Sequence, residues 1–164
     1  MAAIAADPQA PAAEAAGLAA RSRAEVDALL GILFESAAVG IALVGLDGPE
    51  REVVLEANAS FAAILGRTLG ALRGTRALSA GVDPSHAPGL ARAMEELQRG
   101  PGTVHRGEYR FTRADGERVW LDLTASVVGG TDGAARHRLV HVLDVTAYHA
   151  GTYADRRRFT TMPA

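Results

Sequence analysis

The stretch RADGERVWLDLTASVV (Arg113–Val128) decides the fold. Ala114-Asp115-Gly116 is typical of a hairpin turn, because glycine readily adopts the positive φ that such a turn needs. After the turn the polarity alternates, and in a strand successive side chains point to opposite faces. One face carries Val119, Leu121, Leu123, Ala125 and Val127, and the other carries Trp120, Asp122, Thr124 and Ser126. We therefore predict a strand with one face on the core and the other on the outside of a sheet.

Trp120 is unexpected on an outer face that meets only water. Two interpretations fit. Trp120 lies beneath the N-terminal helix of its own chain, or it lies in an interface with a second copy or another domain, where aromatic residues are enriched.

The remaining segments place this strand in an α+β domain. We predict strands at 40–48, 52–58, 104–112 and 136–144, each a run of apolar or alternating residues bounded by turn signals. Asn58 is the expected cap of a helix that stops at Gly66, and short helical turns follow between Arg67 and Ser85. A further helix covers 86–100 with Leu90, Met94 and Leu97 on its buried side. Strands grouped around a helical block predict one antiparallel sheet with helices on one face.

The N-terminal third is predicted to contain one helix. Residues 1–21 are rich in alanine and proline and are interpreted as a disordered tail. Apolar residues at helical spacing then predict a helix over 22–35, with Ser22 as its N-cap. This helix packs on its own domain or pairs with a partner chain. We expect a domain over 36–146 and a linker over 147–164.

Composition excludes several classes of function. The formal charge of −2 argues against nucleic-acid binding and against a polybasic membrane patch. The chain has no cysteine, so it has no disulfide, thiolate metal site or cysteine nucleophile. No apolar run reaches membrane-spanning length, and the N-terminus lacks the basic start of a signal peptide. A soluble cytoplasmic protein is expected.

Five motifs in order resemble the PAS domain family. They are LFESAAVGIALVGLDG (Leu33–Gly48), EANASFAAILG (Glu56–Gly66), LRG (Leu72–Gly74), YRFTRADGERVWLDLTASVV (Tyr109–Val128) and LVHVLDVT (Leu139–Thr146). The resemblance implies a five-stranded antiparallel sheet in the order 2-1-5-4-3, with helices that enclose a pocket. It implies a sensor or dimerisation module in signalling proteins such as histidine kinases or cyclic-dinucleotide enzymes, which passes the signal onward through Asp144 and Thr146.

The same resemblance argues against the cofactors of other PAS domains. Ala77 stands where the photosensory branch has its reactive cysteine, and Leu121 and Val142 stand where that branch has amides that bind the flavin ring. His86 resembles a capping residue rather than a haem ligand, and Met94 is expected in the core. His105, His137 and His141 show no metal-ligand spacing. We predict no cofactor and no metal.

The predicted interior is almost wholly apolar. It comprises Ile41 or Ala42 together with Leu43, Val54, Phe61, Leu65, Leu90, Met94, Leu121, Leu123, Val140 and Val142. Two outcomes fit: the side chains fill the space, or a small cavity accepts a hydrophobic ligand.

No residue pattern indicates catalysis. The serines 36, 60, 79, 85 and 126 have no histidine and carboxylate in a known motif. We expect a non-catalytic module that acts by protein–protein contact, with Leu29, Leu33 and Trp120 in a homodimer or domain interface. The alternatives are a small-molecule sensor and, as a third hypothesis, a stand-alone enzyme. The segment ADRRRFTTM (Ala154–Met162) is similar to the start of a further PAS unit.

Overall fold

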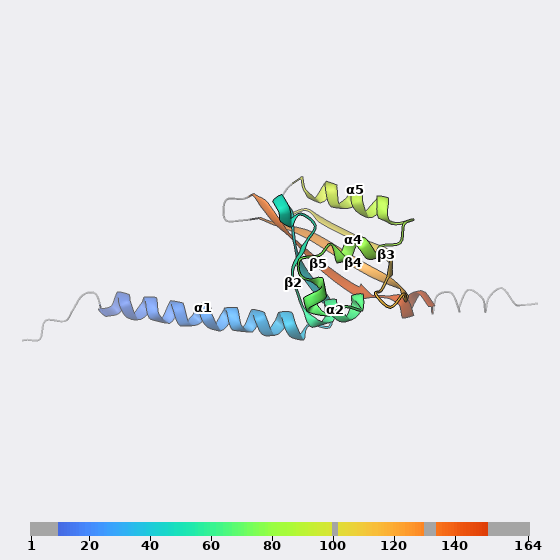
Figure 1. Cartoon of the computed structure of the whole chain (residues 1–164). Helices are drawn as coiled ribbons and strands as arrows, with labels where there is room; N and C mark the ends of the chain where they lie inside the picture. Colours follow the sequence, from blue (N-terminus) through green and yellow to red (C-terminus); the bar gives the residue numbers. More distant parts are fainter. Residues whose placement is uncertain (1–9, 100–101, 130–133, 151–164) are drawn as a thin grey trace, which may run out of the picture. The chain divides into compact units, whose positions relative to one another are not determined.

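The structure is a computed structural model that describes residues 10–99, 102–129 and 134–150. It divides into two units, Met1–Ser36 and Ala37–Ala164. The first unit contains helix α1 (Ala10–Ser36), and the second contains the sheet and the remaining helices (Figure 1). No described helix is long and apolar enough to cross a membrane.

The second unit is built on one five-stranded sheet. Its strands are β1 (Gly40–Gly45), β2 (Val54–Ala57), β3 (Val104–Thr112), β4 (Arg118–Gly129) and β5 (Ala135–Asp144). They are ordered β2-β1-β5-β4-β3, and each neighbouring pair is antiparallel. The expected α+β class and strand order are confirmed. The hairpin between β3 and β4 turns at Gly116, whose φ of 88° is the positive value that the sequence predicted.

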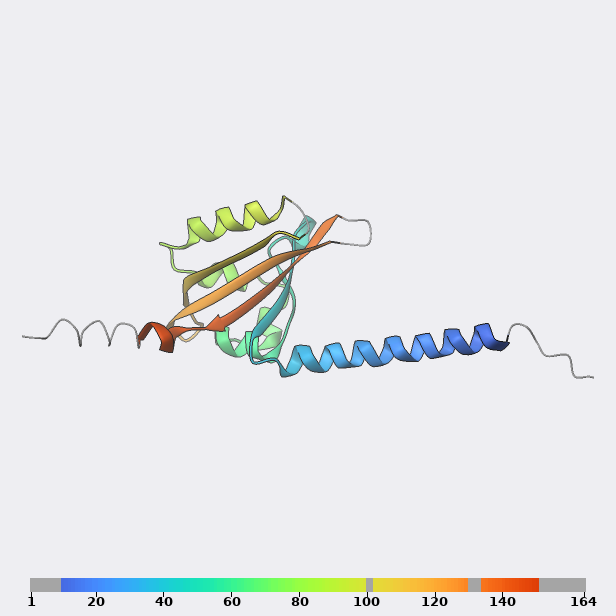
Figure 2. The same ribbon diagram turned by 180° about the vertical axis from the view of Figure 1, so that it is seen from behind.

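Short helices cover one face of this sheet. They are η1 (Gly48–Glu50), α2 (Ala59–Leu65), α3 (Leu69–Leu72), α4 (Ala77–Gly81) and α5 (Ala87–Leu97). Figure 1 shows α2 and α4 in front of the strands and α5 above them, beside β3, and Figure 2, the view from behind, shows the strands in front of α2 and α4. The core lies between the two layers because alternate strand residues turn inward. The predicted inner face of β4 is confirmed: Val119, Leu121, Leu123, Ala125 and Val127 are buried.

Asn58 attaches α2 to the sheet. Its Oδ1 accepts hydrogen bonds from the backbone amides of Phe61 and Ile41, both at 2.9 Å, and its Nδ2 donates to the carbonyl of Val39 at 3.0 Å. The first bond is the predicted N-cap. The other two connect the start of α2 to β1 and to the residue just before it, and Asn58 is fully buried.

Helix α1 is longer than predicted. It begins at Ala10, so the expected start at Ser22 is wrong. The residues before Ser22 are mostly alanine, the strongest helix former, and proline at position 11 is tolerated in the first turn of a helix. Low complexity was therefore misread as disorder over 10–21, while residues 1–9 lie outside the described part of the chain. In the second half of α1, where the structure describes the side chains, Leu29 and Leu33 are 58% and 63% exposed.

Candidate functional site

Most of the predicted pocket residues form a solid core. The side chains of Phe61, Leu65, Leu121, Leu123, Val140 and Val142, with Ala42 and Val54, are at most 2% exposed and belong to one cluster. The predicted inward position of Leu43 is wrong. It lies between Ala42 and Val44, which are both buried, so alternation along β1 turns Leu43 to the outer face of the sheet, where it is partly exposed.

A cavity of about 340 Å³ lies beside this core rather than inside it. Helices α4 and α5 form its apolar wall, with Leu78, Leu90, Ala91 and Met94 among the lining residues. Of the residues predicted to line a pocket, only Leu90 and Met94 do so. The core residues of β4 and β5 pack against one another and leave no cavity between them. The cavity lies instead between α4, α5 and the turn before β2.

The other wall of the cavity carries a half-buried ion pair that the sequence analysis missed. Arg138 of β5 is 1% exposed, and its Nη1 and Nη2 donate to the two carboxylate oxygens of Glu52 at 2.8 and 3.0 Å. Alternation would have found it, because Arg138 precedes the inward-facing Val140 by two residues. The expectation of an almost wholly apolar interior is wrong at this position.

Arg138 is incompletely paired. Its Nε is shielded from solvent and has no hydrogen-bond partner in the described structure. A buried donor without an acceptor costs about 1–3 kcal/mol, and more when it is charged. Glu52 is itself held in an unusual conformation, with a φ of 62°. Non-glycine residues in this region are uncommon, and such strain often occurs at functional sites.

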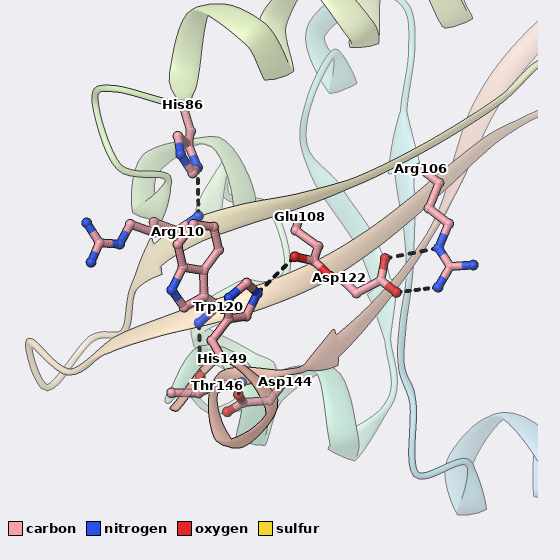
Figure 3. Close-up of polar contacts among 9 residues, drawn as sticks. All are labelled: His86, Arg106, Glu108, Arg110, Trp120, Asp122, Asp144, Thr146 and His149. Carbon is pink, nitrogen blue, oxygen red and sulfur yellow. Dashed lines mark hydrogen bonds and ion pairs between the residues drawn. The ribbon is translucent and has the colours of Figure 1, made fainter. Parts of the chain in front are cut away.

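The outer face of the sheet carries a second group of contacts, centred on Trp120 (Figure 3). The ring of His149 stacks on the indole at a centroid distance of 4.4 Å and an interplanar angle of 15°. The Nε2 of His149 lies 2.8 Å from a carboxylate oxygen of Glu108, and the guanidinium of Arg110 lies 5.4 Å from the indole centroid. Residues 146–150 are helical, so the chain that leaves β5 covers the tryptophan.

This arrangement differs from both interpretations of Trp120 that the sequence offered. Its described ring contacts come from His149 of the C-terminal segment, Arg110 of β3 and His86, none of which either interpretation considered. The sequence contains no local signal for this contact, since Trp120 and His149 are far apart along the chain and lie on different elements. Whether α1 or a partner also contacts Trp120 stays a prediction.

The exit from β5 is tied down at Asp144 and Thr146. The hydroxyl of Thr146 accepts a hydrogen bond from the backbone amide of Trp120, and its own amide donates to the carboxylate of Asp144, both at 2.9 Å. The guanidinium of Arg113 forms an ion pair with the same carboxylate. The two predicted relay residues therefore connect the end of β5 with β4 and with the β3–β4 hairpin.

His86 does not cap α5 with its side chain. Its Nδ1 instead accepts a hydrogen bond from the backbone amide of Arg110 at 2.9 Å, on the edge strand β3. His86 does occupy the N-cap position of α5, as predicted, but its side chain does not face solvent as a cap, because the amide of Arg110 on the edge strand β3 is a donor within reach of the ring. The loop before α5 contains a tight turn, in which hydrogen bonds from the side chain and the backbone of Ser85 lower the pKa of the Asp83 carboxyl.

Other titratable groups near this face are satisfied locally. The guanidinium of Arg106 donates two hydrogen bonds to Asp122, and this interaction raises the pKa of Arg106. Burial raises the pKa of Tyr109, whose hydroxyl lies 2.7 Å from the Nε2 of His105. Among the described residues, no group of three or more histidine or acidic side chains is placed to hold a metal ion.

Comparisons with known proteins agree with this architecture. A family model described as PAS domain matches residues 38–147. A PAS domain from Colwellia psychrerythraea is similar with a TM-score of 0.65 at 14% identity, over 74% of this chain and 98% of that one. An RNA-binding light-oxygen-voltage receptor is similar with a TM-score of 0.63 at 25% identity, over 75% of this chain but only 34% of its own length.

A third similar structure comes from a signalling enzyme. It is the N-terminal domain of a diguanylate cyclase with PAS/PAC sensor from Marinobacter aquaeolei, with a TM-score of 0.58 at 16% identity. The match covers 68% of this chain and 98% of that domain. No curated protein matches the chain.

Proposed function

Because this chain belongs to the PAS domain family, whose members are sensory domains of signalling proteins, we propose that it is a non-catalytic module that passes a signal to its neighbours by protein–protein contact. The hydrogen bond from the Trp120 amide to the Thr146 hydroxyl carries this proposal. It couples the start of β4 to the segment that follows β5.

The coupling has two parts that can respond together. On one side, Asp144 holds the amide of Thr146 and the guanidinium of Arg113. On the other side, His149 rests on Trp120 and lies beside Glu108. A small shift of β4 against β5 changes both sets of contacts, because each joins residues of different strands. The direction in which the chain leaves the domain after β5 then depends on the position of β4 relative to β5.

Removal of the Thr146 hydroxyl tests the relay. Thr146→Val keeps the shape of the side chain and removes the acceptor of the Trp120 amide. Trp120 is the only tryptophan in the chain, so its fluorescence reports directly on this site. We expect a changed emission spectrum and faster hydrogen exchange of the Trp120 amide, with the sheet retained by circular dichroism.

Thr124→Val is the matched control. Thr124 lies on the same outer face of β4, and its side chain makes no hydrogen bond in the described structure. The control should leave emission and amide exchange unchanged. If Thr146→Val behaves like Thr124→Val in both measurements, the exit segment is not coupled to Trp120 and the relay proposal is wrong.

Dimerisation through α1 is the second part of the proposal. Leu29 and Leu33 are four residues apart on the helix and both are exposed, which is costly unless another surface covers them. Sedimentation velocity should show a wild-type dimer that dissociates in Leu29→Asp and Leu33→Asp but persists in Arg23→Ala. A monomer in every case contradicts the dimer. Trp120→Asp in the same series tests the predicted interface role of Trp120.

The cavity favours a second candidate function, a sensor for a small ligand. A volume of about 340 Å³ is within the range of small-molecule sites, and its helix-side wall is mainly apolar. Saturable binding of an apolar probe, followed through the signals of Leu90 and Met94, tests this candidate independently of the relay.

A further inference from the structure

We propose that the cavity between α4, α5 and the turn before β2 binds a small molecule that has an apolar body and a single carboxylate, and that Arg138 holds the carboxylate. This inference rests on the second candidate function, ligand sensing. It goes beyond a purely hydrophobic ligand because it names the polar group and the residue that recognises it.

The first argument is the unused hydrogen-bonding capacity of Arg138. A guanidinium has five N–H donors, and its planar shape can bind carboxylates along more than one edge. Glu52 occupies the edge formed by the two terminal nitrogens, and the Nε is left without a partner. Arg138 lines the cavity, and its Nε is covered by the surrounding side chains. A small shift of the guanidinium toward the cavity would let a bound ligand supply the missing acceptor.

The second argument is the shape and polarity of the cavity. Its walls combine the apolar side chains of Leu78, Leu90 and Met94 with the ion pair of Arg138 and Glu52. Sites for small molecules have this composition, a mainly apolar lining with few polar groups that fix orientation. An apolar body on the helix side therefore places its polar group near the guanidinium.

The third argument is the local charge. Arg51 and Glu95 also line the cavity, so the four charged side chains balance. Selection of a carboxylate therefore depends on the donors of Arg138 rather than on a net positive field. A carboxylate offers a guanidinium two ionised acceptor oxygens in a bidentate pair, whereas an amide of the same shape offers one neutral acceptor, which favours the carboxylate.

Three benzene derivatives separate the contributions. Toluene, benzamide and benzoate have nearly the same size and differ only in an apolar, a neutral polar and a charged substituent. Titration of the full chain is followed by NMR, through the methyl signals of Leu90 and Met94 and the side-chain Nε–H signal of Arg138. We expect benzoate to bind about tenfold more tightly than benzamide and to move the Arg138 signal.

Variants assign the effect to named residues. Glu52→Gln keeps an acceptor for Arg138 and removes the competing charge, so it should strengthen benzoate binding about tenfold and leave toluene unchanged. Arg138→Met should abolish the preference for benzoate and retain toluene. Ala91→Phe fills the cavity and should abolish binding of all three probes with the ion pair intact.

The outcomes distinguish this inference from the function on which it rests. If toluene binds in the cavity but benzoate binds no more tightly than toluene, in wild type and in Glu52→Gln, the carboxylate is the wrong ligand class and the sensor function survives. If none of the three probes moves the Leu90 and Met94 signals in either protein, both are overturned. Because Glu52→Gln and Ala91→Phe leave Arg138 in place, the test does not depend on the folding of Arg138→Met.

Discussion

Asn58 connects the first turn of α2 to β1, so its replacement by alanine should cost far more than the loss of a helix cap. The cap itself, the bond to the Phe61 amide, is worth about 1 kcal/mol. The amide of Ile41 and the carbonyl of Val39 also lose their partners, and because both bonds are only partly buried each loss costs about 1–2 kcal/mol, in the lower part of the range for buried groups. We expect Asn58→Ala to lower the free energy of unfolding by about 3–5 kcal/mol, a large share of the stability of a small domain.

Urea unfolding, followed by Trp120 fluorescence and circular dichroism, measures this cost. Thr68→Ala is the matched control, because the hydroxyl of Thr68 caps α3 through one exposed bond to the Ala71 amide. It should cost about 1 kcal/mol or less. Asn58→Ser can still cap α2 but has no amide to donate to Val39, so it should recover only about 1 kcal/mol relative to Asn58→Ala. If Asn58→Ala costs no more than Thr68→Ala at the same m-value, the two bonds to β1 contribute nothing and the reasoning is wrong.

Two further predictions concern α4, α5 and the loop between them. A Cβ at Gly81 would lie 2.0 Å from the ring of Phe111, whereas a Cβ at Gly89 would meet nothing within 4 Å. Gly81→Ala should therefore destabilise the domain by about 1–3 kcal/mol. Gly89→Ala should stabilise it by up to about 1 kcal/mol, because alanine is the better helix former. Equal effects of the two substitutions on thermal unfolding would contradict the close contact between Gly81 and Phe111. The lowered pKa of Asp83 contributes stability above the unfolded carboxyl pKa of about 4 that is lost as the pH falls through the folded value. Ser85→Ala should raise this pKa toward its ordinary value in a carboxyl NMR titration, and an unchanged midpoint would show that the Ser85 hydroxyl is not its cause.

Local sequence patterns were sufficient to predict the strands of the domain, a helix cap and a hairpin turn. Alternation along β4 gave its two faces correctly, because a strand residue's face depends only on its position in the repeat. Asn58 and the turn at Gly116 were identified for a similar reason, since a cap and a tight turn need particular residue types within a few positions. The start of α1 was wrong because an alanine-rich segment reads equally well as a helix and as low complexity.

The candidate sites depended on contacts between distant segments. Arg138 and Glu52 are 86 positions apart, and nothing near either residue indicates the partner. His86 was assigned to a helix cap because the open edge of β3 cannot be seen from its own neighbours. The stacking of His149 on Trp120 likewise exists only once β3, β4 and β5 lie side by side.

The sequence by itself therefore determined the strands and the main helices of the sheet domain, the inner face of β4 and, through the family that its five motifs resemble, the order of the strands. Only the tertiary structure decided where the cavity lies, that a charged pair forms one of its walls, and that the exit segment rests on the outer face. The physical reason is range: backbone conformation and face periodicity are set by residues a few positions apart, whereas cavities and ion pairs arise where side chains from separate elements meet.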